Sequence, residues 1–170
     1  DKSYPYVMIK KAQDFPRIEY IRRPKRYKKA QLFGPFPVGS NISKIIRTLT
    51  RAFKLRDCSE HEFKGRKEPC LLYQMKQCSA PCVGKISSDE YAKDIDLALN
   101  LFKGAHKSKK TMNLLTSRMM DHAESEEFEQ AANIRDYIEE LDAFCQTSFD
   151  QKVELLKDTS LDIIAFYIGP

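Results

Sequence analysis

Four cysteines lie close together in a segment of this chain that offers few apolar residues for a core. Cys58, Cys70, Cys78 and Cys82 fall within 25 residues, with 11, 7 and 3 residues between successive cysteines. The cysteines, prolines and charges of residues 56–84 show no helical or strand period. Something other than apolar burial must organise this segment. In a chain that we expect to be intracellular, such a cluster favours metal binding or redox chemistry over disulfides.

Four thiolates suffice to complete either a tetrahedral zinc site or an iron–sulfur cluster. The spacing leaves both open, because only Cys78 and Cys82 are close together and the paired cysteine knuckles typical of zinc are absent. The alternative is that the four thiols are unrelated packing residues, as free cysteines often are. Because the segment has little core, we predict that all four cysteines bind a metal, while the isolated Cys145 packs in the interior.

Charge is distributed unevenly along the 170 residues. Residues 1–85 contain 20 Lys or Arg and 7 Asp or Glu, whereas residues 86–170 contain 9 and 17. The charge of residues 1–85 therefore favours binding to a polyanion, and that of residues 86–170 favours a different partner. The alternative is a solvated surface, and for any single charge this alternative is the better interpretation.

Seven basic residues lie between Arg17 and Lys29, with only Glu19 opposing them and with Tyr20 and Tyr27 interleaved. Lys and Arg neutralise phosphates while aromatic rings stack on exposed bases, so this stretch predicts salt-sensitive binding of nucleic acid. A merely solvated basic loop is the alternative. The predicted DNA-binding residues are Lys2, Arg17, Arg22, Arg23, Lys25, Arg26, Lys28 and Lys29.

The pattern of apolar residues predicts an α+β fold. Residues 4–10 and 17–22 alternate apolar and polar side chains, which is typical of short strands in a small, partial antiparallel sheet. Residues 42–53 place apolar side chains on one helical face, with Ser40 or Asn41 as the N-cap. This helix is expected to pack on the strands.

A second helix is predicted after Ser87, which forms a capping box with Glu90. Gly104 is a natural stop for it, and residues 107–110 form a basic spacer. Residues 162–168 read as a buried strand of a further domain. Because the chain starts at Asp1 and this apolar run is cut short, we expect an internal piece of a longer protein.

Residues 111–145 predict an αα-hairpin of two amphipathic helices with a turn at Ser125. The hairpin carries nine acidic residues against Arg118 and Arg135. Two short helices cannot enclose a core, so their apolar faces bury against the rest of the chain or against a partner that carries basic residues. The predicted partner-binding residues are Leu115, Met119, Phe128, Ala131, Ala132, Arg135, Ile138 and Leu141.

The sequence shows no catalytic arrangement. His61, His106 and His122 lack Cys or Ser partners, and neither a phosphate-binding loop nor a metal-binding carboxylate pair is present. No apolar stretch approaches the roughly 20 residues that cross a bilayer. We therefore expect a cytoplasmic protein without a membrane partner.

Several motifs resemble the UvrC family, in the order that this family uses. Residues 1–6, 14–17 and 33–36 are similar to the C-terminal part of its GIY-YIG nuclease domain. The segment with Cys78-Ser79-Ala80-Pro81-Cys82 resembles its cysteine-rich region, and Phe128-Glu129 with Ile134-Arg135-Asp136 resembles its UVR motif. The implied units are a GIY-YIG end (1–55), a cysteine-rich metal-binding region (56–86), a connecting helix and spacer (87–110), a UVR hairpin (111–145), and a linker with the first strand of an RNase H-like region (146–170).

This resemblance implies a DNA endonuclease subunit that joins UvrB on damaged double-stranded DNA and incises on both sides of the lesion in nucleotide excision repair. It also implies a 4Fe-4S cluster on the four cysteines, with zinc as second choice, and docking of the hairpin on UvrB. The family's nuclease centres, which use Mg or Mn, would lie outside this chain, so we expect no incision by the chain alone. The alternative is a non-enzymatic zinc-bound adaptor that links nucleic acid to a helical protein partner.

Overall fold

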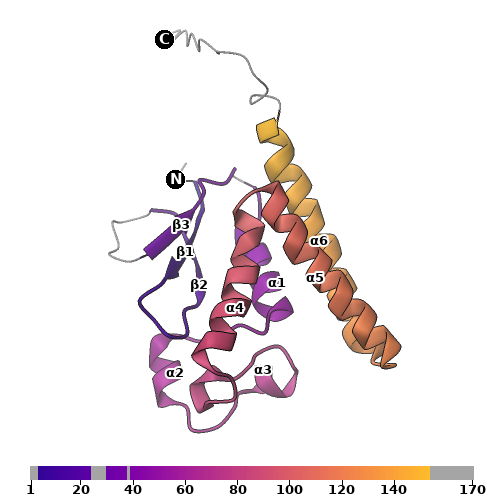
Figure 1. The fold of residues 1–170 in the computed structure, drawn as a ribbon. Coiled ribbons are helices and arrows are strands. Elements are labelled where there is room, and N and C mark those ends of the chain that lie inside the picture. Colours follow the sequence, from indigo (N-terminus) through magenta and orange to yellow (C-terminus); the bar gives the residue numbers. More distant parts are fainter. Residues whose placement is uncertain (1–3, 24–29, 38, 154–170) are drawn as a thin grey trace.

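The computed structural model describes residues 4–23, 30–37 and 39–153. Strands β1 (Tyr6–Lys10), β2 (Ile18–Ile21) and β3 (Ala30–Phe33) form an antiparallel sheet in the order β2-β1-β3 (Figure 1). The predicted α+β class and the first two strands are confirmed. β3 lies outside the predicted strands.

β1 is the central strand of the sheet, and Val7, Met8 and Ile9 are all buried. Val7 pairs with Tyr20 on β2 and with Phe33 on β3. Successive side chains on a strand point to opposite faces. Three consecutive buried residues therefore mean that this strand is covered on both faces.

Helix α1 (Ile42–Ala52) packs on the sheet and buries the predicted stripe that contains Ile45 and Leu49. Its start differs from the prediction in one respect, because no side chain caps the helix. Asn41 occupies the N-cap position with a left-handed φ of 47°, and the Ser40 hydroxyl donates instead to the carbonyl of Pro37 at 2.7 Å.

The cysteine-rich segment contains only short elements: α2 (Glu60–Gly65), α3 (Leu71–Gln74) and the 3-10 turn η1 (Pro81–Val83). Neither α2 nor α3 has a buried residue. These elements lie together at one end of the molecule, below α1 and α4 in Figure 1. The segment is loop-rich, as predicted, and its buried residues include Cys78, Ala80 and Pro81 near η1.

Helix α4 (Ser88–Leu99) begins with the predicted capping box, in which the Ser87 hydroxyl accepts from the Glu90 N–H at 3.3 Å. It continues into the 3-10 turn η2 (Asn100–Phe102), and Gly104, with a φ of 104°, leads directly into α5 (Ala105–Glu124). The predicted basic spacer at residues 107–110 is therefore wrong. This stretch is helical because Thr111 is buried and donates its hydroxyl to the carbonyl of Leu97 at 2.6 Å.

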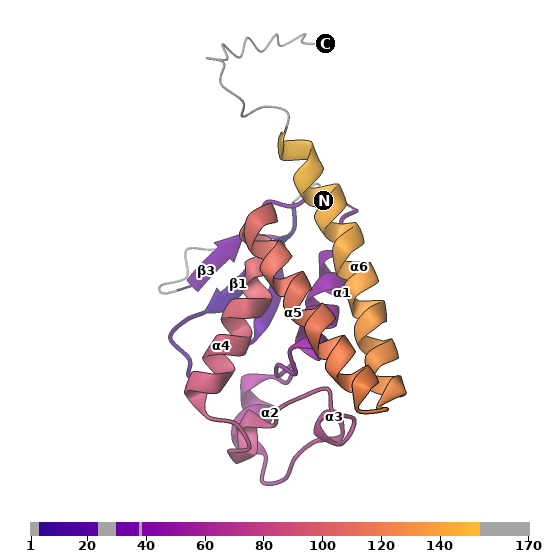
Figure 2. The same cartoon turned by 45° about the vertical axis from the view of Figure 1, so that its right-hand side comes forward.

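Helices α5 and α6 (Phe128–Val153) lie side by side and confirm the predicted hairpin (Figure 2). The end of the hairpin away from its turn, which we call the root, is held by Phe144 of α6. The ring centroid of Phe144 lies 5.9 Å from that of Phe36 and 6.0 Å from that of Phe102. Leu115 and Leu141 belong to the same buried cluster as the residues of β1, α1 and α4. We call this cluster the common core.

Two expectations lie partly or wholly outside the described residues: the closing strand at 162–168 and most of the linker from 146 onward. Within the described ranges, no helix is both long enough and apolar enough to cross a membrane.

Candidate metal centre and partner interface

The four clustered cysteines lie at the ends and junctions of the short elements in residues 56–84. Cys58 precedes α2, Cys70 is the N-cap residue of α3, and Cys82 lies within η1. All four are free thiols, with Cys78 buried and the other three half-buried. Turns rather than long helices or strands therefore set the positions of the predicted ligands.

The thiols influence one another's protonation. Burial raises the pKa of Cys78, and the charges of Cys70, Cys58 and Cys82 raise it further. Burial likewise raises the pKa of Cys82, with smaller contributions from Cys58 and Cys70. Neighbouring like charges disfavour ionisation, so a bound cation would favour the thiolate forms of Cys78 and Cys82. In the part of the chain that the structure describes, no group of three or more His, Cys, Asp or Glu side chains is arranged so that it could hold a metal ion.

Arg56 anchors the start of this segment, and its side chain is only 1% exposed. Its guanidinium donates to the carbonyl of Phe15 at 2.5 Å and to that of Cys58 at 3.2 Å, and it forms an ion pair with Glu60. It also lies 4.4 Å from the ring centroid of Phe63. The hydrogen bond from Arg56 lowers the pKa of Glu60. This one side chain thus fixes the backbone of Cys58 relative to the sheet.

Tyr91 of α4 is fully buried and belongs to the same hydrogen-bond network. Its hydroxyl donates to the carbonyl of Pro16 at 2.9 Å and accepts from the backbone N–H of Arg56 at 3.1 Å. Burial raises the pKa of Tyr91. The hydroxyl therefore stays protonated and joins α4 to two backbone groups far away in the sequence.

Replacing Tyr91 by Phe should lower the free energy of unfolding by about 1–3 kcal/mol, because it leaves a buried carbonyl and a buried N–H without partners. Urea unfolding followed by circular dichroism measures this loss. Tyr73→Phe is the matched control, since Tyr73 is 37% exposed and its change should stay within about 0.5 kcal/mol. Equal stabilities of the two variants would contradict the role assigned to the Tyr91 hydroxyl.

The tip of the hairpin contacts the cysteine-rich segment. The turn between α5 and α6 contains Glu126 with a left-handed φ of 60°, followed by Glu127. The Glu127 carboxylate lies 2.5 Å from His122 Nδ1 and accepts from Lys76 at 3.4 Å. Both interactions lower the pKa of Glu127, and the hydrogen bond with His122 makes the largest contribution. Because Lys76 lies two residues before Cys78, the tip is tied to the immediate neighbourhood of the cysteines.

Three of the predicted partner-binding residues pack inside this chain, which corrects that part of the prediction. Leu115 and Leu141 are fully buried in the common core, and Ala131 is 9% exposed. Their stripe serves intramolecular packing, the alternative stated above, because α6 lies on α1 and α5 lies on η2. The other predicted residues are more accessible: Met119, Ala132 and Ile138 are half-buried, and Phe128 and Arg135 are exposed.

Among the side chains that the structure describes, the hairpin exposes two large apolar ones, and one of these was predicted as a partner contact. Phe128 is 67% exposed and Met120 is 56% exposed. Met120 does not belong to the i, i+3, i+4 stripe that points inward, so the helical pattern alone assigned it to no functional face. We call Met120 and Phe128 the apolar tip.

The described part of the predicted DNA-binding stretch lies on and beside β2. Arg17 pairs with Glu19 at 3.3 Å, and Lys10 pairs with the same carboxylate at 3.1 Å. Arg22 donates to the Tyr20 hydroxyl at 2.7 Å and is exposed, as is Arg23. DNA binding by this stretch stays a prediction. The remaining predicted residues, Lys2, Lys25, Arg26, Lys28 and Lys29, lie outside the described residues.

A family model described as the UvrC/Cho excinuclease middle domain matches residues 4–101, more than half of the chain. The chain belongs to this family. A second model, the UvrB/uvrC motif, matches residues 109–144 and coincides with the hairpin. The resemblance to UvrC that we inferred from the motifs is thereby confirmed.

Curated relatives of this UvrC-family chain carry the name UvrABC system protein C. The protein from Shewanella oneidensis is 41% identical over 138 residues, which cover 81% of this chain and 22% of that protein. The one from Coxiella burnetii is 40% identical over 141 residues, covering 83% and 23%. The chain thus spans about one-fifth of the length of these relatives. No solved structure matches it.

The UvrC/Cho middle-domain match runs without a break across the boundary that we placed between residues 55 and 56. Residues on both sides of this boundary contribute to the common core, among them Leu49 and Tyr91. The motifs compared with the end of a GIY-YIG domain fall almost entirely within the match. The domain boundaries therefore stay predictions.

Proposed function

We propose that this chain is part of a UvrC subunit that acts in the cytoplasm with UvrB to incise damaged DNA on both sides of a lesion in nucleotide excision repair. The observation that carries the proposal is the succession of two family matches along one chain, the second of which coincides with a hairpin that exposes an apolar tip. In this role the chain supplies a metal-binding segment, a docking hairpin for UvrB and part of the DNA-binding surface.

The apolar tip is the proposed point of docking. A Phe that is 67% exposed next to a helix turn has a large apolar area to bury, which is typical of the residues that dominate a binding interface. The surrounding surface is acidic, with Glu124, Glu126 and Glu129 near the turn. A partner hairpin with an apolar centre and a basic rim would complement both features.

Replacing Phe128 by Ala should weaken binding of UvrB by about 2–4 kcal/mol, which is roughly 30- to 1,000-fold in Kd. Isothermal titration of UvrB into the chain measures the change. Leu32→Ala is the control, because Leu32 is a 41% exposed apolar residue on β3, away from the hairpin, and should leave Kd unchanged. Unchanged affinity of the Phe128 variant would refute docking through the tip.

We also propose that Cys58, Cys70, Cys78 and Cys82 hold a 4Fe-4S cluster, with zinc as second choice. The donor set supports this, since all four are free thiols from one segment, and the neighbouring cysteines help to raise the pKa of Cys78 and of Cys82, an effect that a bound cation would relieve. Binding would draw the thiols from their described arrangement into coordination. The bound group would cross-link the short elements, and a structural or regulatory role fits a hydrolytic reaction that has no redox step.

Anaerobic purification followed by absorption spectroscopy and by iron, sulfide and zinc assays tests the identity of the metal. Broad absorbance near about 400 nm with about four irons per chain supports the cluster. A colourless protein with one zinc would support the four cysteine ligands but would identify the bound metal as zinc. A folded, metal-free protein would contradict the proposal that these cysteines bind a metal.

We further propose that incision requires parts of UvrC beyond these residues, because the matched relatives are several times longer than this chain. Robust nicking of DNA by the chain alone, with Mg or Mn, would contradict this.

A further inference from the structure

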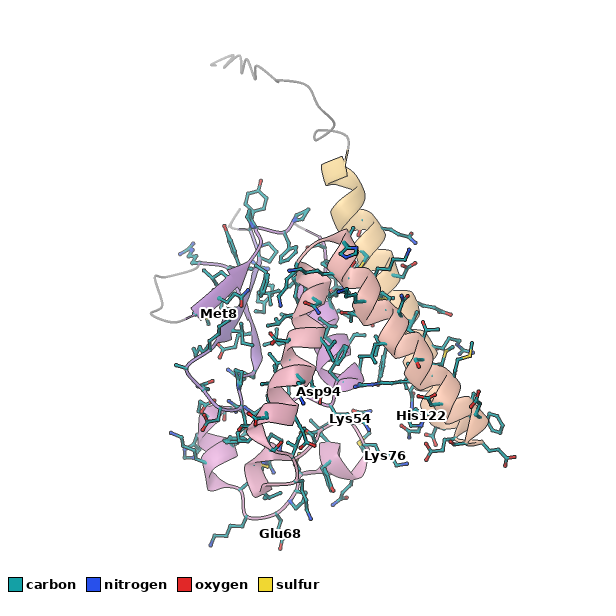
Figure 3. The ribbon with its side chains drawn as sticks, in the orientation of Figure 1. Met8, Lys54, Glu68, Lys76, Asp94 and His122 are labelled. Atoms are coloured by element: carbon teal, nitrogen blue, oxygen red, sulfur yellow. The ribbon has the colours of Figure 1, made fainter. Side chains whose placement is uncertain are left out.

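Two adjoining cavities form a groove between the cysteine-rich segment and helices α1, α4 and α5. Their volumes are about 850 Å³ and 390 Å³, and both are lined by Lys54, Lys76 and Asp94. Figure 3 shows these three side chains around the space between α3, α4 and α5, with His122 farther along α5. No local motif marks this groove, because its residues come from separate segments of the chain. We call it the lysine groove.

The lysine groove is positively charged. Its basic lining residues are Arg51, Lys54, Lys76, Lys85, Lys93 and Arg118, and its acidic ones are Glu90 and Asp94. Both acids are already engaged, since Glu90 accepts from Ser87 in the capping box and Asp94 pairs with Arg118 at 3.4 Å.

Four of the cations, Arg51 among them, remain available to a ligand, and three of these four line the larger cavity. Lys54, Lys85 and Lys93 are exposed and make no ion pair with any residue of the described part of the chain. Three exposed ammonium groups along one groove can contact successive phosphates, which gives binding that is independent of sequence and sensitive to salt.

An aromatic ring lies beside these cations. Tyr73 lines the larger cavity and is 37% exposed. Aromatic rings next to a positive groove bind single strands because each unpaired base presents a face for stacking. A duplex keeps its bases stacked inside, so it would use only the lysines. The combination therefore favours a single strand over a duplex.

We propose that the lysine groove binds a single-stranded stretch of DNA, with phosphates on Lys54, Lys85 and Lys93 and a base against Tyr73. The choice of DNA as the ligand rests on the proposed function in repair. The groove is distinct from the predicted basic stretch on β2. Cys78 lines the same cavity, so the bound strand would pass beside the cysteine cluster.

The test compares two triple variants of the chain by fluorescence anisotropy with a labelled single-stranded oligonucleotide of about 20 nucleotides. The groove variant is Lys54→Gln, Lys85→Gln and Lys93→Gln. The control variant changes three exposed lysines outside the groove, Lys11, Lys64 and Lys109, to Gln. Because each phosphate contact on a single strand contributes about 0.7 to the slope of log Kd against log salt, the groove variant should lose about 2 from this slope. The control should lose much less.

Tyr73→Ala provides the second measurement. It should weaken binding of the single strand about tenfold and leave binding of a duplex of the same sequence nearly unchanged. Equal slopes for the groove and control variants would overturn the proposal, and equal losses on single strand and duplex would overturn the single-strand assignment.

The same variants are titrated with UvrB, and their melting curves are compared with that of the parent. The apolar tip is intact in all of them, so UvrB affinity should persist when DNA affinity falls. A failure of the proposal that the lysine groove binds DNA is therefore distinguishable from a failure of the proposal that the apolar tip binds UvrB.

Discussion

Replacement of Cys70 by Ser should abolish metal binding and unfold residues 56–84, while the common core stays folded. Metal bound to thiolates can contribute on the order of 10 kcal/mol to folding. In this segment α2 and α3 have no buried residue, so little apolar burial compensates for the loss of the metal. Limited trypsin digestion detects the change at the exposed Lys64 and Lys67.

Cys145→Ser is the matched control for this experiment. Cys145 is a half-buried thiol on α6 and is not one of the proposed ligands, so its replacement should preserve both metal content and the protease pattern. A Cys70→Ser chain that matches the parent in metal content and in digestion would exclude Cys70 as a ligand.

Replacement of Arg56 by Ala should cost about 3–5 kcal/mol of unfolding free energy, because it removes a buried cation that serves several partners at once. The carbonyls of Phe15 and Cys58 would lose their donor, and Glu60 its ion-pair partner. Urea unfolding at neutral pH measures the loss.

Arg47→Ala, on the exposed surface of α1, is the control for general effects of removing an arginine and should change stability by less than about 0.5 kcal/mol. Arg56→Lys should give an intermediate value, because one ammonium group cannot reproduce the planar fork of donors. If Arg56→Ala were as stable as Arg47→Ala, the anchoring role of Arg56 would be wrong.

Elements with a strong period could be predicted from the sequence. The stripe of α1 that contains Ile45 and Leu49 and the capping box of Ser87 with Glu90 are local patterns, and the structure contains both. The start of α5 could not be predicted in the same way. Its lysine-rich first turns are held in place by the tertiary hydrogen bond of Thr111 to α4, which no local pattern records.

In the candidate site, too, local patterns could be predicted from the sequence and tertiary contacts could not. The cysteines could be recognised as a group because they share one segment, whereas the burial of Arg56 depends on residues 41 positions away in the chain. The hairpin stripe was ambiguous for a physical reason. Leu115 and Leu141 give the same periodicity whether they pack on their own chain or on a partner, and only the tertiary structure distinguishes the two cases.

The hairpin is held at its root, near its tip and between them, where α6 lies on α1. Its root is clamped by the rings around Phe144, and near its tip Glu127 is tied to Lys76 of the cysteine-rich segment. The 20 residues of α5 make it about 30 Å long, so a rotation of about 5° at the root would displace the tip by roughly 3 Å. The packing of α6 on α1 and the contact between Glu127 and Lys76 both oppose such a rotation, so the direction in which Phe128 is presented depends on the rest of the fold.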